Sequence, residues 1–211
     1  MAPHHEGPDI GNRHLPFRTV GQPDGHEAPL QRQHRAIRRD LDELAVDGDI
    51  NLAAVESSYT EMVGAVESLN QIVERRIATE VSLNSQLITA QAFRAEVVNA
   101  VEAQLDTADE ADIETFLRIS LSANLLNSLF AEASLMDNAA DVTALQESMF
   151  DQVDEMTVNV AILGDAVSGD LRNAVSNLNS LVEGDRSVPE LRIAAIEQSA
   201  RANAVAEEAG A

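Results

Sequence analysis

Histidines are the side chains of this chain best suited to metal binding or acid–base catalysis, and four of the five lie within the first 29 residues. These four are His4, His5, His14 and His26, and their spacing fits no ligand pattern on a helix or a strand. No Glu-x-x-His pair is present for a di-iron site of the ferritin type. The absence of cysteine also excludes thiolate catalysis and Cys-based zinc sites. The sequence therefore predicts no metal site and no cofactor.

Catalytic motifs are missing as well. The sequence contains no glycine-rich phosphate loop, no HExxH motif and no nucleophile elbow. Beyond the first 29 residues, His34 is the one histidine that could serve as a general base. We therefore predict that the chain is not an enzyme and that it has no catalytic residues.

Three arginines fall beside apolar helical stripes and are the candidate ligand-binding residues. They are Arg94, Arg118 and Arg192. An arginine at the seam of a helical bundle can hold a carboxylate through two parallel hydrogen bonds. The alternative is structural: each arginine lays its aliphatic stem along the helix and pairs with a neighbouring acid. The sequence leaves both interpretations open.

The formal net charge of −22 is unevenly distributed. Residues 1–46 carry six arginines and seven acids, for a net −1, whereas residues 47–211 carry eight arginines and 29 acids, for a net −21. Such a surface repels phosphate backbones and anionic lipid head groups, so nucleic acid and direct membrane-surface binding are excluded as partners. No run approaches the roughly 18 consecutive apolar residues of a membrane span. We expect no span in this chain, and we expect the chain alone to be soluble.

Proline is absent from residue 30 to residue 188, and this absence limits the architecture sharply. A proline inside a helix removes a hydrogen bond and clashes with the preceding turn, at a cost of about 3 kcal/mol. Aromatic residues make up only 3% of the chain, so its core must consist mainly of aliphatic side chains, which suit helix seams. The fold class predicted is all-α: an elongated antiparallel helical bundle with one very long helix.

The chain divides by composition into a tail and a helical region. Residues 1–29 hold five of the six prolines and lack periodicity, which predicts a disordered or poorly packed tail. Residues 30–208 are predicted to form a helical-bundle domain. A bend is expected in its fourth helix, at Gly164 and at residues 168–170, and Ser187 before Pro189 is expected to cap the last helix. The expected helices cover residues 30–45, 50–105, 111–136, 142–181 and 187–208.

The longest predicted helix has two patterns of apolar residues. Its first half shows steps of three and four, which indicate a heptad seam: Leu52, Val55, Tyr59, Met62, Val66, Leu69 and Val73. Wider steps follow and predict a departure from the strict heptad: Ile77, Val81, Leu87, Phe93 or Arg94, Val97, Val101 and Leu105.

The helix predicted over residues 111–136 is apolar on more than one side. A main stripe recurs at steps of four: Ile113, Leu117, Leu121, Leu125 and Leu129. Three further apolar residues flank this stripe: Phe116, Leu126 and Phe130. We expect this helix to expose a long apolar surface that a second copy of the chain would cover.

Deleting residues 1–29 is expected to leave the folded domain intact. Their composition cannot bury enough apolar surface to offset the entropy lost on ordering. Thermal unfolding of the full chain and of the deletion variant, followed by circular dichroism, should give the same midpoint. A substantially lower midpoint for the deletion variant would show that these residues belong to the core.

Three helical segments share their order and pattern with a known family of helical bundles. They are LNQIVERRIATEVSLNSQLITAQAFR at residues 69–94, FLRISLSANLLNSLFAEAS at residues 116–134, and LVEGDRSVPELRIAAIEQSARANAVAEE at residues 181–208. The last segment has a glycine-containing turn at Gly184, a short apolar segment at Val188 and a Leu191-Arg192 pair. Over residues 35–208 the chain resembles the TorS-like sensors and the related helical bimodular ligand-binding domains of bacterial histidine kinases and chemoreceptors.

The resemblance implies that residues 30–208 are a sensor domain of a two-component system on the periplasmic side of the inner membrane. Such domains detect a small metabolite or a ligand-loaded periplasmic binding protein and pass a helix displacement through the membrane. They work as dimers, so the resemblance implies a homodimer. Family members also have an upstream helix, two membrane spans and a signalling module that do not appear here, which implies a fragment of a longer membrane receptor.

A second class of function stays open from the sequence. Long helices with apolar stripes and an acidic exterior are also typical of structural coiled-bundle proteins, such as phasin-like or filament-associated modules. In that case the chain is an interaction protein without a sensory role. Membrane spans and a kinase core in the neighbouring reading frame would favour the sensor.

Overall fold

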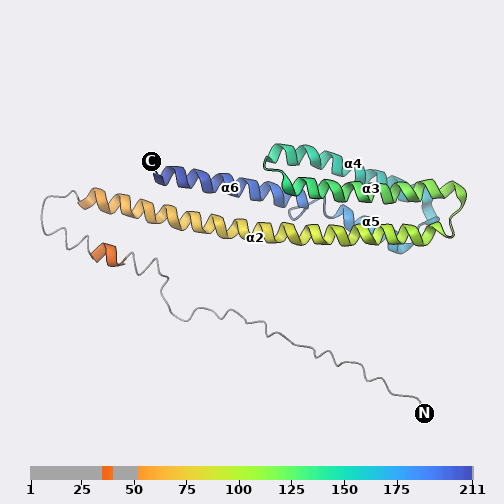
Figure 1. Ribbon diagram of the computed structural model, residues 1–211, viewed down its shortest axis with the longest axis horizontal. Coiled ribbons are helices and arrows are strands. Elements are labelled where there is room, and N and C mark those ends of the chain that lie inside the picture. The colour runs from red at the N-terminus through yellow and green to blue at the C-terminus, as the bar shows by residue number, and fades with distance from the viewer. Residues whose placement is uncertain (1–34, 40–51, 211) are drawn as a thin grey trace, which may run out of the picture. The chain divides into compact units, whose positions relative to one another are not determined.

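The computed structural model describes residues 35–39 and 52–210 (Figure 1). The chain separates into two units, Met1–Glu56 and Ser57–Ala211. In the first unit, residues 35–39 are helical. The predicted tail over residues 1–29 and the rest of the helix predicted over residues 30–45 lie outside the described residues.

One very long helix, α2, runs from Leu52 to Leu105 without interruption. Its 54 residues include no proline and a single glycine, Gly64, which leaves the helix continuous. The prediction of a nearly unbroken helix over residues 52–104 is therefore confirmed.

The second unit consists of helices, and no strand occurs among the residues that the structure describes. After α2 come four further α-helices and one short 3-10 turn, η2, which confirms the prediction of an all-α helical bundle. Their bounds are Glu110–Leu135 for α3, Ala139–Leu163 for α4, Gly164–Ala166 for η2, Gly169–Asn179 for α5 and Val188–Gly210 for α6.

The predicted bend separates α4 from α5. Gly164 ends α4 with a φ of 53°, a left-handed conformation that glycine adopts without strain. The side chain of Ser168 then accepts a hydrogen bond of 3.2 Å from the backbone N–H of Leu171 and caps α5. Arg172 in turn donates to the carbonyl oxygen of Gly164, which also accepts the backbone N–H of Val167 at the end of η2.

Ser187 caps α6, as the sequence predicts. It is fully buried, and its Oγ lies 3.4 Å from the backbone nitrogen of Glu190, which donates to it. Replacing Ser187 with alanine is expected to lower the free energy of unfolding by about 1 kcal/mol, because one N–H of the first turn loses its partner. Urea denaturation measures the difference.

Ser128→Ala is the matched control for this substitution. Ser128 lies inside α3 and donates to the carbonyl oxygen of Asn124 within the same helix. Because alanine is the better helix former, this control should leave the free energy of unfolding unchanged or slightly raised. Equal losses in the two variants would contradict a capping role for Ser187.

The core fills the space between the second half of α2, the hairpin of α3 and α4, and α5. Beyond α5, Val182 and Val188 extend it to the start of α6, and Gln146 on α4 donates a 3.2 Å hydrogen bond to the carbonyl oxygen of Val182. The largest fully buried side chains of these helices are Phe116, Phe130, Ile119, Leu126, Met149, Met156, Leu171 and Leu178.

The buried face of α2 differs from the one expected in its second half. The buried apolar residues of α2 follow one another at steps of seven, seven and four, so the core face keeps a heptad-like spacing there. They are Leu83, Ala90, Val97 and Val101. Of the residues predicted to lie on the seam in this half, Ile77 and Val81 are exposed, whereas the others are buried or partly buried against the core. The small Ala90 gives a weaker apolar signal in the sequence than Ile77 does, but it allows close helix contact.

A row of exposed apolar residues instead follows α2 on another face; we call it the α2 stripe. Its members are 41–69% exposed. Val66, Ile77 and Ile88 recur at intervals of eleven residues, the period at which a row of side chains turns only slowly around an α-helix. Much of the seam predicted over residues 52–73 is therefore not buried within the chain. The α2 stripe consists of Met62, Val66, Val73, Ile77, Val81 and Ile88.

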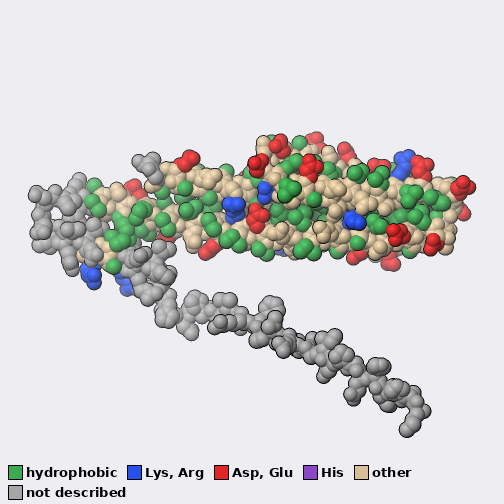
Figure 2. All heavy atoms as spheres, viewed as in Figure 1, with side chains coloured by type: hydrophobic (Ala, Val, Ile, Leu, Met, Phe, Trp, Pro, Cys, Tyr) green, Lys and Arg blue, Asp and Glu red, His purple; other side chains and the backbone are tan. Residues whose placement is uncertain are grey.

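The apolar faces of α3 are also distributed differently from the expectation. The flanking residues Phe116, Leu126 and Phe130 are buried, whereas most of the main stripe is exposed and only Leu129 is half-buried. Hydrophobic side chains are accordingly visible over much of the surface of the second unit (Figure 2). We call the exposed row the α3 stripe; it consists of Ile113, Leu117, Leu121 and Leu125.

Candidate functional site

The helices α2 and α6 lie side by side and run in opposite directions (Figure 1). Gln198 on α6 donates a 3.2 Å hydrogen bond to the hydroxyl oxygen of Thr79 on α2. Further along, Ser58 and Met62 of α2 line one groove together with Val205 and Ala209 of α6. The end of α6 therefore lies beside α2 near Ser58 and Met62, within the second unit.

A second groove lies where this helix pair meets the turn between α3 and α4. Its volume is about 360 Å³. The charged side chains that line it come from three parts of the chain: Arg76 and Glu80 from α2, Arg192 from α6 and Asp137 from the turn. We call it the Arg192 groove. The rest of its lining belongs to one face of α6 and consists of Ala195, Ile196, Ser199, Ala200 and Asn203.

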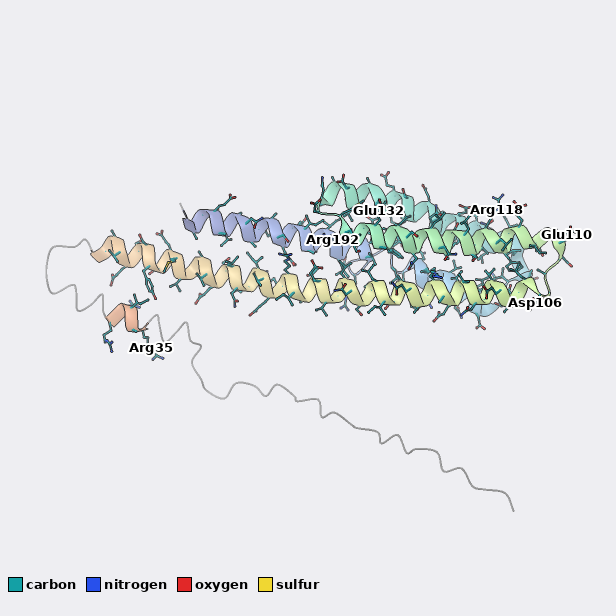
Figure 3. The ribbon with its side chains drawn as sticks, in the orientation of Figure 1. Arg35, Asp106, Glu110, Arg118, Glu132 and Arg192 are labelled. Carbon is teal, nitrogen blue, oxygen red and sulfur yellow. The ribbon has the colours of Figure 1, made fainter. Side chains whose placement is uncertain are left out.

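Arg192 joins the three parts of this groove. Its side chain is 17% exposed, its Nε donates a 2.5 Å hydrogen bond to the carbonyl oxygen of Met136, and its Nη1 lies 3.6 Å from Oε1 of Glu80. Met136 ends α3, so its carbonyl has no helical partner and takes the arginine instead. Figure 3 shows Arg192 at this end of the α3–α4 hairpin. The guanidinium thus ties α6 to both α2 and the hairpin.

The Arg192 groove also contains one cation and one anion that are not paired. Among the described residues, no hydrogen bond or ion pair involves the side chain of Arg76 or Asp137. The contact between Arg192 and Glu80 is long for a charge-assisted hydrogen bond, which is usually about 2.7–2.9 Å. Arg192 therefore keeps N–H donors that neither Met136 nor Glu80 saturates.

The structure places the three candidate arginines apart. Arg118 is exposed near the other end of α3 (Figure 3), and its Nη2 lies 2.7 Å from Oε1 of Glu114, one turn away. The hydrogen bond and the charge of Glu114 raise the pKa of Arg118. Arg118 therefore pairs with a neighbouring acid, which is the structural interpretation that the sequence left open.

Arg94 takes a place in the heptad-like row of α2, between Ala90 and Val97. It is half-buried, and its Nε is fully buried without a hydrogen-bond partner among the described residues. It does not line the Arg192 groove. Of the three arginines, only Arg192 lies in a groove together with other charged groups.

Sequence reasoning missed the partners of Arg192. Arg76 and Glu80 lie one turn apart on α2, and Asp137 lies in a turn, but such residues are common on acidic helical proteins. The available signal was the Arg75-Arg76 pair, because arginine is scarce after residue 46. Nothing local in the sequence shows that α6 returns beside this part of α2.

Neither a metal nor a membrane is suggested by the described part of the chain. No group of three or more histidine, cysteine, aspartate or glutamate side chains in it could hold a metal ion. No helix in the described ranges is long and apolar enough to cross a membrane.

No protein-family model, no curated protein and no solved structure matches this chain.

Proposed function

We propose that this chain is the sensory input domain of a bacterial two-component receptor and acts on the periplasmic side of the inner membrane. The observation that carries the proposal is the α2–α6 pair: two long antiparallel helices that still line one groove near Ser58 and Ala209, tied together at Arg192 beside a second open groove. A domain that receives a signal at its groove and delivers it to a membrane needs two such helix ends on one side. The stimulus is a small metabolite or a ligand-loaded periplasmic binding protein.

The mechanism we propose is a displacement of α6 relative to α2. Helices are stiff along their axes, so a small shift at the groove reaches their far ends, provided that the pair has two discrete arrangements. Arg192 forms an ion pair with Glu80 across the helix pair, beside the hydrogen bond from Gln198 to Thr79, and its bond to Met136 anchors α6 to the α3–α4 hairpin. Occupation of the groove would bias one arrangement by changing these contacts.

The proposed receptor works as a homodimer. Two rows of exposed apolar residues, the α2 stripe and the α3 stripe, support this proposal, because large apolar patches on a protein surface usually mark a partner surface. The acidic exterior keeps such an assembly discrete by charge repulsion.

A chimaeric receptor tests the sensory role. The chain is placed between the two membrane spans of a transmembrane histidine kinase whose output drives a reporter gene, and cells are exposed to separate pools of metabolites. We expect at least one pool to change the output several-fold. The Arg192→Gln chimaera should be inserted equally well but should lose most of the response, because the ion pair of Arg192 with Glu80 between α6 and α2 is lost.

A second candidate is a structural coiled-bundle protein without a sensory role. The observation in its favour is the length of the α2 stripe, which suits lateral association of long helices. In the same assay, a chimaera that is inserted normally but responds to no metabolite pool and to no periplasmic extract would favour this structural role.

A further inference from the structure

The Arg192 groove is lined by two positive and two negative side chains, and their pairing indicates the charge of its ligand. Glu80 is already engaged by Arg192 at 3.6 Å, which leaves the unpaired Arg76 and Asp137 as one positive and one negative group in the same groove. A ligand that satisfies both groups must itself carry both charges. A simple anion would leave Asp137 unpaired, and a simple cation would leave Arg76 unpaired.

The overall charge of the chain supports the same choice. With a formal charge of −22, the surface repels anions before they reach the groove, and the repulsion grows with the charge of the ligand. A molecule without net charge is not repelled. The two arginines of the groove meanwhile disfavour a ligand that is only a cation.

The uncharged residues that line the Arg192 groove also suit a small molecule. Ser199 and Asn203 offer neutral hydrogen-bonding groups, whereas Ala195, Ile196 and Ala200 offer an apolar surface on the same face of α6. The volume of about 360 Å³ lies near the lower end of the usual range for small-molecule sites, which is about 300–1,000 Å³. The groove therefore suits a short zwitterion with a small side chain better than a large or flat ligand.

We propose that the Arg192 groove binds a free zwitterionic amino acid. Arg76 and the unsaturated N–H groups of Arg192 hold the carboxylate, Asp137 holds the ammonium group, and Ile196 with its alanine neighbours takes the side chain. The incoming carboxylate shares Arg192 with Glu80, so binding weakens the ion pair between α6 and α2. This inference names the ligand class of the site and rests on the sensory function proposed above.

Thermal unfolding of the full chain with each of the twenty proteinogenic L-amino acids tests the proposal. At a concentration about 100 times the dissociation constant, a bound ligand should raise the unfolding midpoint by about 5 °C or more. Acetate, propionate and methylamine, which carry only one of the two charges, are the matched probes. We expect at least one small amino acid to raise the midpoint and these three probes to leave it unchanged.

Three variants test whether the amino acid binds in the Arg192 groove. Arg76→Gln and Asp137→Asn should each weaken binding tenfold or more, measured by calorimetric titration, while both fold normally because the two side chains are exposed. Arg118→Gln removes another exposed arginine that does not line the groove, and this variant should bind as the parent chain does.

Three results would each overturn the assignment. They are no shift with any amino acid, an equal shift with acetate, and binding that survives both groove substitutions. The first result leaves the sensory role itself intact if the chimaeric receptor still answers a metabolite pool or a binding protein, so the two proposals fail separately.

Discussion

Replacing Leu121 with glutamate is expected to convert the proposed dimer of this chain to a monomer at micromolar concentration. Leu121 is the most exposed member of the α3 stripe, at 58%, and lies at its centre between Leu117 and Leu125. A carboxylate there would be taken out of water in any interface that covers the stripe, without a partner to compensate. We expect the dissociation constant of the dimer to rise about 100-fold or more, as at interface hot spots. Sedimentation velocity measures the change.

Val158→Glu provides the control for this substitution. Val158 is 57% exposed, almost the same as Leu121, but lies on α4 and is not a member of the α3 stripe. The same charge placed there should leave the dimer unchanged. A parent chain that sediments as a compact monomer and binds no hydrophobic dye would mean that the bundle needs no partner, and the dimer proposal would then be wrong.

Truncating Phe130 to alanine is expected to lower the stability of the fold far more than loss of the Ser187 cap does. Phe130 is fully buried in the core, among other side chains without exposed surface. Removing a buried ring leaves a cavity that the neighbouring helices fill only in part, at a cost of about 3–5 kcal/mol. Guanidinium unfolding followed by circular dichroism measures the free energy of unfolding of the parent chain and of the Phe130→Ala variant.

Leu135→Ala removes apolar atoms from the same helix without opening a cavity. Its side chain is 83% exposed, so the free energy of unfolding should stay within about 0.5 kcal/mol of the parent. If Phe130→Ala lost less than about 1 kcal/mol, the hairpin of α3 and α4 would not be tightly packed at this position.

Helix boundaries could be predicted from the sequence because local chemistry sets them. The absence of proline and the single Gly64 allow α2 to continue from Leu52 to Leu105, while Ser187 caps the start of α6 just before Pro189. Each of these effects acts within one or two helical turns. Such information is fully contained in a short stretch of sequence.

The choice of the core face could not be predicted in the same way. Both faces of α3 are apolar, and periodicity alone cannot tell which one meets the rest of the chain; the flanking Phe116, Leu126 and Phe130 are the buried set. The Arg192 groove is harder still, because Arg192 and Met136 are 56 positions apart and Glu80 is more distant again. The sequence identified Arg192 as a candidate but contained no local signal for its partners.

The eleven-residue spacing of Val66, Ile77 and Ile88 in the α2 stripe gives this surface a translational repeat. Eleven residues make three turns, so the same side-chain row returns after about 16.5 Å along the axis. A helix packed on the stripe can therefore find nearly equivalent contacts at positions separated by that length and poorer contacts between them. The surface thus favours a few discrete lengthwise registers over continuous sliding, and a partner could change its register only in whole steps.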